Sequence, residues 1–150
     1  LTWDHLHEPH VIELPSGRLL GAIRVHCRKV APVDTCYTTY SDDGGKTWSM
    51  PKSTDVDGLP PHLFLHSSGA VILSYACRAS EKKSERAAVS YDGGATWSDD
   101  YVLNDNIPFS DLGYPATTEC ADGSLITVYY QCYPGDDFCS VLQTKWKLEK

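Results

Sequence analysis

The sequence predicts an all-β protein built from about three units, each a blade of about four short antiparallel strands, as in a β-propeller. An eight-residue turn occurs twice, at Ser41–Trp48 and Ser90–Trp97, and both copies read Ser-x-Asp-x-Gly-x-Thr-Trp, 49 residues apart. A longer repeat begins at Pro9, at Pro61 and, more weakly, at Tyr114. Units of roughly 50 residues that contain several hairpins are typical of radial β repeats.

Each longer repeat has the same order of elements: a short strand, a Ser-Gly or Asp-Gly turn, and an apolar strand, which together form a hairpin signal. The apolar strands are expected at Leu19–Val25, Val71–Ala76 and Leu125–Tyr130. The third unit lacks the eight-residue turn and runs from Asp136 straight into a last strand. We therefore expect blades at about 8–58, 59–110 and 111–150, with no helix longer than a turn.

The eight-residue turn has a physical basis. A short Asp side chain accepts hydrogen bonds from backbone N–H groups of the turn, and glycine supplies the positive φ of the bend. We expect Asp43 and Asp92 to hold the turns together rather than to bind metal. Trp48 and Trp97 re-enter a strand and are expected in the core.

These turns resemble the Asp box of sialidases and related BNR-repeat proteins. The resemblance implies a sialidase-like propeller of six blades, of which this chain supplies about half, at the C-terminal side. We therefore expect either further blades that precede these residues or a second chain that completes the ring. The resemblance covers roughly residues 8–130.

Composition and charge limit the partners. The net charge is −7, with 13 basic and 20 acidic residues. This balance argues against a nucleic-acid or anionic-membrane partner. These 150 residues contain no apolar run of membrane length, and a signal or transit peptide would belong to the N-terminal part that we expect to precede them.

Six cysteines leave two alternatives open. Disulfides Cys27–Cys36 and Cys132–Cys139 would suit an oxidising compartment, or all six cysteines are small buried hydrophobic residues. We favour a secreted or periplasmic protein over a cytoplasmic one. The cysteines lack C-x-x-C spacing and the six histidines do not cluster with them, so we expect no zinc or other metal site. We also expect no cofactor.

Three arginines stand at the ends of apolar strands: Arg24, Arg78 and Arg86. A guanidinium fork is a natural ligand for a carboxylate, so these residues are candidate substrate-binding groups. The alternative is that they are solvated strand ends or form ion pairs between blades.

The resemblance to sialidases assigns roles to some of these residues. In that family a Glu is followed by a strand, a turn and a second strand that ends in Arg, and Glu8 and Arg24 follow this order. By the same match Arg86 is a second arginine of the substrate-binding triad, with Arg78 as its rival, and Tyr114 is the nucleophile. The implied partner is a sialylated or acidic glycan.

The chemistry explains this set. A sialic acid carries a carboxylate on its anomeric carbon, which repels a carboxylate nucleophile, and sialidases use Tyr instead. A neighbouring base, here Glu8, would take the phenolic proton. The family's first triad arginine and its acid/base Asp lie in earlier blades, so the isolated chain is expected to be inactive.

Other interpretations remain open at this point. The chain could be a non-catalytic BNR propeller that binds glycan or protein, or another enzyme for an acidic sugar. Glu8 could be an exposed acid before a strand and Tyr114 a packed aromatic. Pro115 departs from the family, in which Ser commonly follows the Tyr. His10 and His62 are expected to pack between blades.

Overall fold

A computed structural model describes residues 6–25, 35–79 and 81–149. These residues form strands and loops, without any helix and hence without one that could span a membrane. The strands are β1 Leu6–Glu13, β2 Leu19–Val25, β3 Thr35–Ser41, β4 Lys52–Asp57, β5 Leu59–Leu65, β6 Val71–Cys77, β7 Ser84–Ser90, β8 Ser98–Asn104, β9 Leu112–Glu119, β10 Leu125–Gln131 and β11 Ser140–Trp146.

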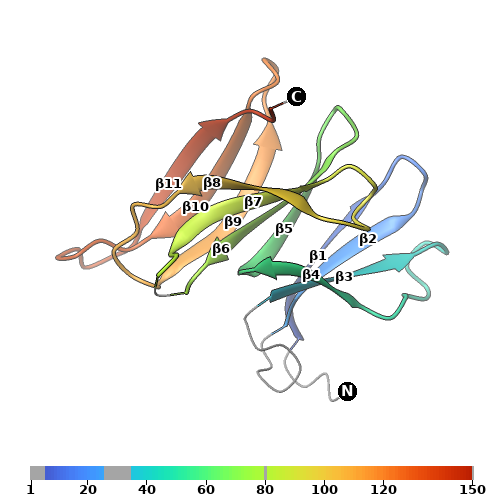
Figure 1. Cartoon of the computed structure of the whole chain (residues 1–150), viewed down its shortest axis with the longest axis horizontal. Helices are drawn as coiled ribbons and strands as arrows, with labels where there is room; N and C mark the ends of the chain where they lie inside the picture. Colours follow the sequence, from blue (N-terminus) through green and yellow to red (C-terminus); the bar gives the residue numbers. More distant parts are fainter. Residues whose placement is uncertain (1–5, 26–34, 80, 150) are drawn as a thin grey trace.

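The strands make three antiparallel sheets in which neighbours in sequence are neighbours in space (Figure 1). The first sheet is β1-β2-β3-β4, the second is β5-β6-β7-β8 and the third is β9-β10-β11. This confirms the all-β prediction, although the third sheet has three strands rather than four in the described part of the chain.

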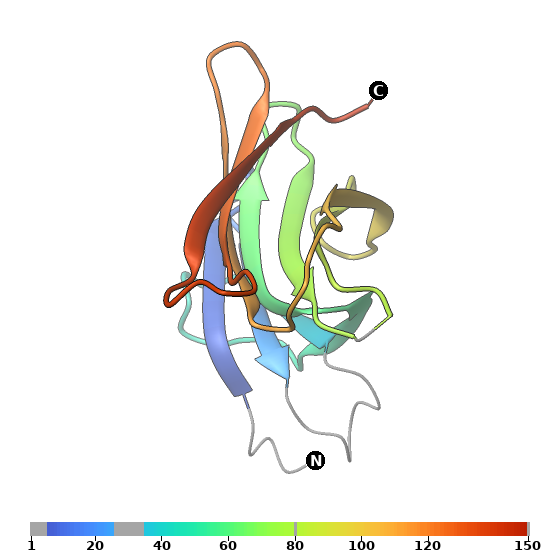
Figure 2. The ribbon, with the colours of Figure 1, turned by 90° about the vertical axis from the view of Figure 1, so that its left-hand side faces the viewer.

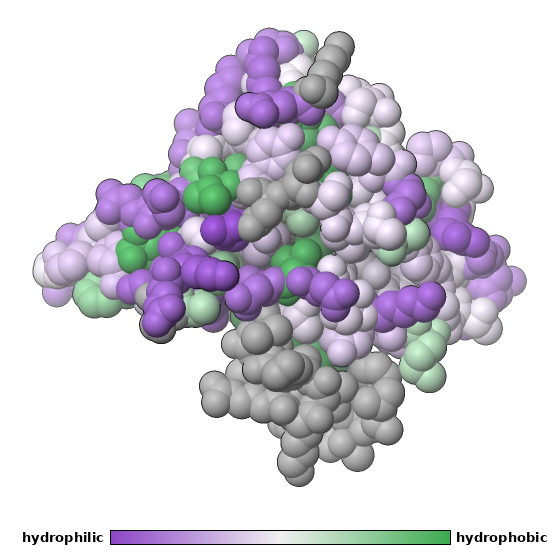
Figure 3. Space-filling view, in the orientation of Figure 1, coloured by the Kyte–Doolittle hydropathy of each residue, from purple (hydrophilic) through white to green (hydrophobic). Residues whose placement is uncertain are grey.

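The sheets stack face to face through their first strands (Figure 2). Strand β5 packs on β1 and β2, and β9 packs on β5 and β6. Apolar side chains of the first two sheets form one core cluster, and those of the last two sheets form another. All seven residues of β6 are buried, because its sheet is covered on both faces, whereas β1 and β11 alternate between more and less exposed residues. On the face shown in Figure 3, hydrophilic residues dominate and hydrophobic ones form only small areas.

The two Asp-box turns join the third and fourth strands of the first two sheets. The Asp43 carboxylate accepts hydrogen bonds from the Thr47 backbone N–H at 2.9 Å and its hydroxyl at 2.6 Å. Asp92 accepts the same two bonds from Thr96, also at 2.9 and 2.6 Å. These threonine hydrogen bonds lower the pKa of each Asp to about 2. Both aspartates therefore hold their turns together, as the pattern indicated.

The two tryptophans of these turns differ. Trp97 packs against the core cluster that includes Leu14, which follows β1, and Leu20 of β2. Trp48 is 43% exposed, so its prediction as a core residue is wrong. The cause is position, because the second turn lies against the first sheet, whereas no described blade covers the first turn.

The cysteines fall into both predicted classes. Cys132 and Cys139 form a disulfide. Cys36 and Cys77 are buried free thiols, and Cys36 donates to the Gly58 carbonyl. Cys27, the proposed partner of Cys36, lies outside the described residues.

Candidate active site

The first strand of each sheet carries a bulge at the same place. Two successive residues stand opposite one on the neighbouring strand, so they leave the hydrogen-bond ladder. The second of each pair is proline, which has no N–H to donate to a ladder. The pairs are Glu8-Pro9 in β1, Pro60-Pro61 in β5 and Tyr114-Pro115 in β9.

The bulges in β1 and β9 also have unusual backbone angles. Glu8 and Tyr114 both have φ of 52°, in the left-handed region that residues other than glycine seldom adopt. A bulge turns its side chain away from the regular alternation of the strand. Glu8 and Tyr114 are thereby aimed differently from the strand residues around them.

Glu8, Tyr114 and Arg24 meet at one point. The Tyr114 hydroxyl donates a hydrogen bond to Glu8 Oε1, although the two residues are 106 positions apart. Arg24 Nη1 donates to both Glu8 oxygens, at 3.3 and 3.1 Å. The Glu8 carboxylate is therefore held between a phenol from the third sheet and a guanidinium from its own sheet.

Arg78 stands beside this group. It follows β6, and its Nε and Nη2 donate to the Leu112 carbonyl at 3.1 and 2.6 Å. Its positive charge lowers the pKa of Glu8 and opposes the rise in the pKa of Tyr114. Two of the three predicted arginines thus lie with the Tyr–Glu pair.

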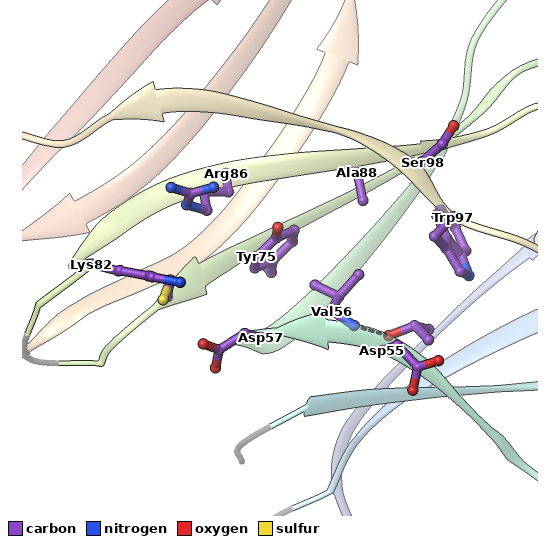
Figure 4. Close-up of a pocket in the computed structure, with 11 residues that line it drawn as sticks. Asp55, Val56, Asp57, Tyr75, Lys82, Arg86, Ala88, Trp97 and Ser98 are labelled. Carbon is purple, nitrogen blue, oxygen red and sulfur yellow. Dashed lines mark hydrogen bonds between the residues drawn. The ribbon is translucent and has the colours of Figure 1, made fainter.

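Arg86 lies elsewhere. It lines a hollow of about 500 Å³ between β4 and the β6–β7 face, together with Asp55, Asp57 and Lys82 (Figure 4). Successive strand residues point to opposite faces, and the preceding residue, Glu85, is the one that faces β9. Of the two rival arginines, the structure places Arg78 with Glu8 and Tyr114, and it places Arg86 between the first two sheets.

Electrostatics define the resting state of the pair. Partial burial raises the pKa of Glu8, but the hydrogen bond from Tyr114 and the ion pair with Arg24 outweigh it and lower that pKa overall. The pKa of Tyr114 is raised, first by its hydrogen bond to Glu8. The resting pair is therefore a carboxylate and a neutral phenol. Tyr114 is 53% exposed and can be reached from solvent.

Two nearby residues were not assigned from the sequence. The Tyr130 ring lies 6.0 Å from that of Tyr114, and its hydroxyl donates to Asp111 Oδ1 at 2.5 Å. Burial and this hydrogen bond raise the pKa of Tyr130 to about 12. The aromatic pair Tyr129-Tyr130 at the end of a predicted strand was the available signal.

Glu85 is the third residue that sequence reasoning missed. It is fully buried, and neither of its carboxylate oxygens has a hydrogen-bond partner among the described residues. Burial raises its pKa to about 8. An acid directly before Arg86, in a strand that continues with the apolar residues Ala87-Ala88-Val89, was its signal in the sequence.

One cluster has the elements of a metal site. Asp111 lies close to the sulfur atoms of Cys132 and Cys139. Because these sulfurs are bonded to each other, they offer no thiolate to a metal. The cluster is therefore a polar contact at a disulfide.

Comparison with known families and structures places the fold. A family model described as "BNR repeat-like domain" matches residues 2–128. A comparison with curated protein sequences found no significant match.

Solved structures that resemble this chain are larger. A protein of unknown function from Dyadobacter fermentans has a TM-score of 0.83 at 24% identity, covering 96% of this chain and 38% of that one. An α-L-arabinofuranosidase of Fusarium graminearum, solved with arabinobiose, has a TM-score of 0.71 at 18% identity, and the match covers 96% of this chain and 46% of that one. An endo-arabinase from Bacteroides thetaiotaomicron has a TM-score of 0.67 at 14% identity, and the match covers 96% of this chain and 57% of that one. At these identities the likeness shows the fold, and the three sheets are blades of a β-propeller. The chain spans less than two thirds of each of these structures.

Proposed function

Because the chain belongs to the BNR repeat-like domain family, we propose that it is part of a sialidase-like glycoside hydrolase. In this proposal it carries the nucleophile, its proton acceptor and two substrate-binding arginines. The substrate is a glycan that ends in sialic acid or a related acidic sugar. The observation that carries the proposal is the contact of Tyr114 with Glu8, which itself is paired with Arg24.

The Tyr114 oxygen attacks the anomeric carbon while its proton passes to Glu8. The bond from that carbon to the leaving oxygen breaks, and the sugar is held on the Tyr114 oxygen. Water then attacks the same carbon and gives a proton to the conjugate base of the acid that protonated the leaving group, Glu8 returns its proton to the departing phenolate, and configuration is retained. A neutral phenol suits a substrate with a carboxylate on the reacting carbon, because a carboxylate nucleophile would meet like charge.

Arg24 and Arg78 bind the substrate carboxylate. Each guanidinium has five N–H donors, and the bonds of Arg24 to Glu8 and of Arg78 to Leu112 leave others for a ligand. Two cations at one place also offset the overall charge of −7, which would otherwise repel an anionic sugar.

A complete ring is required for turnover in this proposal. The acid that protonates the leaving group belongs to blades other than these three, from a longer chain or from a second chain. The fraction of the structural neighbours that this chain spans, 38% to 57%, supports this view. The disulfide supports an oxidising compartment.

The test is made in the assembled ring with an aryl sialoside. Tyr114→Phe is expected to lower kcat by about 1,000-fold or more, because it removes a nucleophile. Tyr91→Phe, which changes a tyrosine that is 62% exposed in the second Asp box, is expected to retain activity. A fluorinated sialosyl fluoride is expected to add one sugar mass to the peptide that contains Tyr114.

A label on another residue, or an active Tyr114→Phe variant, would overturn the mechanism. Sialoside binding without any turnover by the assembled ring would favour the non-catalytic glycan-binding propeller instead.

A further inference from the structure

Glu85 occupies an unusual place behind the candidate active site. In β7 it stands between Ala76 of β6 and Asn104 of β8, and its side chain faces Gly113 of β9. Its relative exposure is 0%, and both carboxylate oxygens lack hydrogen-bond partners among the described residues. A buried polar group without a partner is costly, so Glu85 requires an explanation other than packing.

Gly113 connects Glu85 to the site. A Cβ atom at Gly113 would lie 3.3 Å from Arg78 Nη2, 3.8 Å from Glu85 Oε1 and only 3.0 Å from the Ala76 Cβ. The φ of Gly113 is 124°, which also disfavours any other residue. The acid and the guanidinium therefore flank the same glycine, directly before Tyr114.

We propose that Glu85 is a positioning residue that controls the electrostatic field around Arg78 and the orientation of its guanidinium, and through Arg78 the binding of a substrate carboxylate. The role of Arg78 in this statement rests on the proposed function. When Glu85 is neutral, Arg78 keeps its full positive field for the ligand. When Glu85 is ionised, it competes with the ligand for the same guanidinium.

The ionisation of Glu85 depends on its burial and on one charged neighbour, Arg78. Burial raises the pKa of Glu85 to about 8, and the charge of Arg78 partly opposes the rise. The groups that face it from β6, β8 and β9 are the neutral residues Ala76, Asn104 and Gly113, so Arg78 is the charged neighbour.

The other titratable groups of the site change charge at other pH values. The pKa of Glu8 is lowered, that of Tyr114 is raised above its ordinary value near 10, and that of Tyr130 is about 12. A transition near pH 8 at Arg78 therefore reports Glu85.

The first experiment uses this chain without any ligand. The Nε–H resonance of Arg78, assigned with Arg78→Lys, is followed by NMR from pH 6.5 to 9. We expect a transition with a midpoint near 8 that is absent in Glu85→Gln and unchanged in Glu81→Gln, an exposed acid in the preceding turn. No transition in the wild type, or a transition that persists in Glu85→Gln, would overturn the proposal.

The second experiment measures binding of free N-acetylneuraminic acid by calorimetry at pH 6.5 and pH 9. We expect the wild-type affinity to fall about tenfold over this range, and that of Glu85→Gln to stay constant. Binding that is equally pH-dependent in both proteins would contradict the proposal for Glu85 alone. If the sugar does not bind at any pH, the proposed substrate class fails, and the ligand-free titration still decides the coupling of Glu85 to Arg78.

Discussion

The Asp-box turns and the inner-strand bulges are both repeated in the chain, but they repeat in different ways. In the turns, backbone and side chains recur together, because Asp43 and Asp92 make the same hydrogen bonds at the same distances. In the bulges only the backbone irregularity recurs, and the residues that precede proline are Glu8, Pro60 and Tyr114. A feature that repeats with its side chains stabilises each blade in the same way. A backbone feature whose side chains differ is where a repeated fold can carry different chemical groups.

The turns themselves sharpen the comparison. The hydrogen bonds inside them are alike, yet Trp97 is packed on the preceding sheet and Trp48 is exposed. The same local sequence therefore contributes differently to stability, depending on whether a neighbouring blade covers it.

The largest expected effect is on stability at the second turn. Trp97→Ala should lower the free energy of unfolding by about 3–5 kcal/mol, because it leaves a cavity between two sheets. Trp48→Ala should cost only about 1–2 kcal/mol in this chain, since 43% of that residue is already exposed. Urea unfolding measures both, and equal losses would show that cover by a neighbouring blade does not matter.

A smaller effect is expected for binding of the proposed ligand beside the bulges. Arg78→Ala should weaken binding of N-acetylneuraminic acid by about 30- to 150-fold, the loss of about 2–3 kcal/mol from a charged hydrogen bond. Arg86→Ala should leave it unchanged, because Arg86 lies in the hollow between the first two sheets. Calorimetry measures the affinity of both variants. A larger loss in Arg86→Ala than in Arg78→Ala would make Arg86 the second substrate-binding arginine.

A third effect concerns pH and should be modest. Asp92 has a pKa of about 2, below the ordinary value of 3.8, mainly because of its bonds from Thr96. An acid with a lowered native pKa stabilises the fold above its unfolded pKa and loses that contribution as pH falls through the native value. The wild type should therefore lose stability between about pH 4 and pH 2.

Asp92→Asn should make the free energy of unfolding depend less on pH in this acid range. Combining it with Asp43→Asn should reduce the dependence further. Denaturant unfolding at pH 5 and pH 2.5 measures the difference. If the double variant kept the pH dependence of the wild type, other carboxyl groups would govern the acid behaviour of the fold.

The sequence predicted the hairpins, the blades and the position of the Asp boxes, because turn residues and apolar strands recur at nearly constant spacing. The resemblance to sialidases also singled out Glu8, Arg24 and Tyr114, which the fold brings together. The choice between Arg78 and Arg86 could not be made in the same way. Strand β6 is buried at every position, and β7 at all but one, so their residues show no alternation from which a face could be inferred.

Glu85 was missed for the same physical reason. In a strand covered on both faces, polarity does not reveal the side to which a residue points. The exposure of Trp48 could not be predicted either, because it depends on whether a neighbouring blade covers the turn and not on the turn itself.

The central claim is that the two bulges bring the Tyr114 hydroxyl onto the Glu8 carboxylate, and titration of Tyr114 by NMR tests it in this chain. We predict a Tyr114 pKa above its ordinary value in the wild type, because the bond to Glu8 favours the neutral phenol. Glu8→Gln should lower that pKa, since the carboxylate is lost while Arg24 and Arg78 still favour the phenolate. Glu13→Gln, which changes an exposed acid of the same strand, should leave it unchanged. The same Tyr114 pKa in all three proteins would contradict the contact and, with it, the assignment of the bulges as the functional positions.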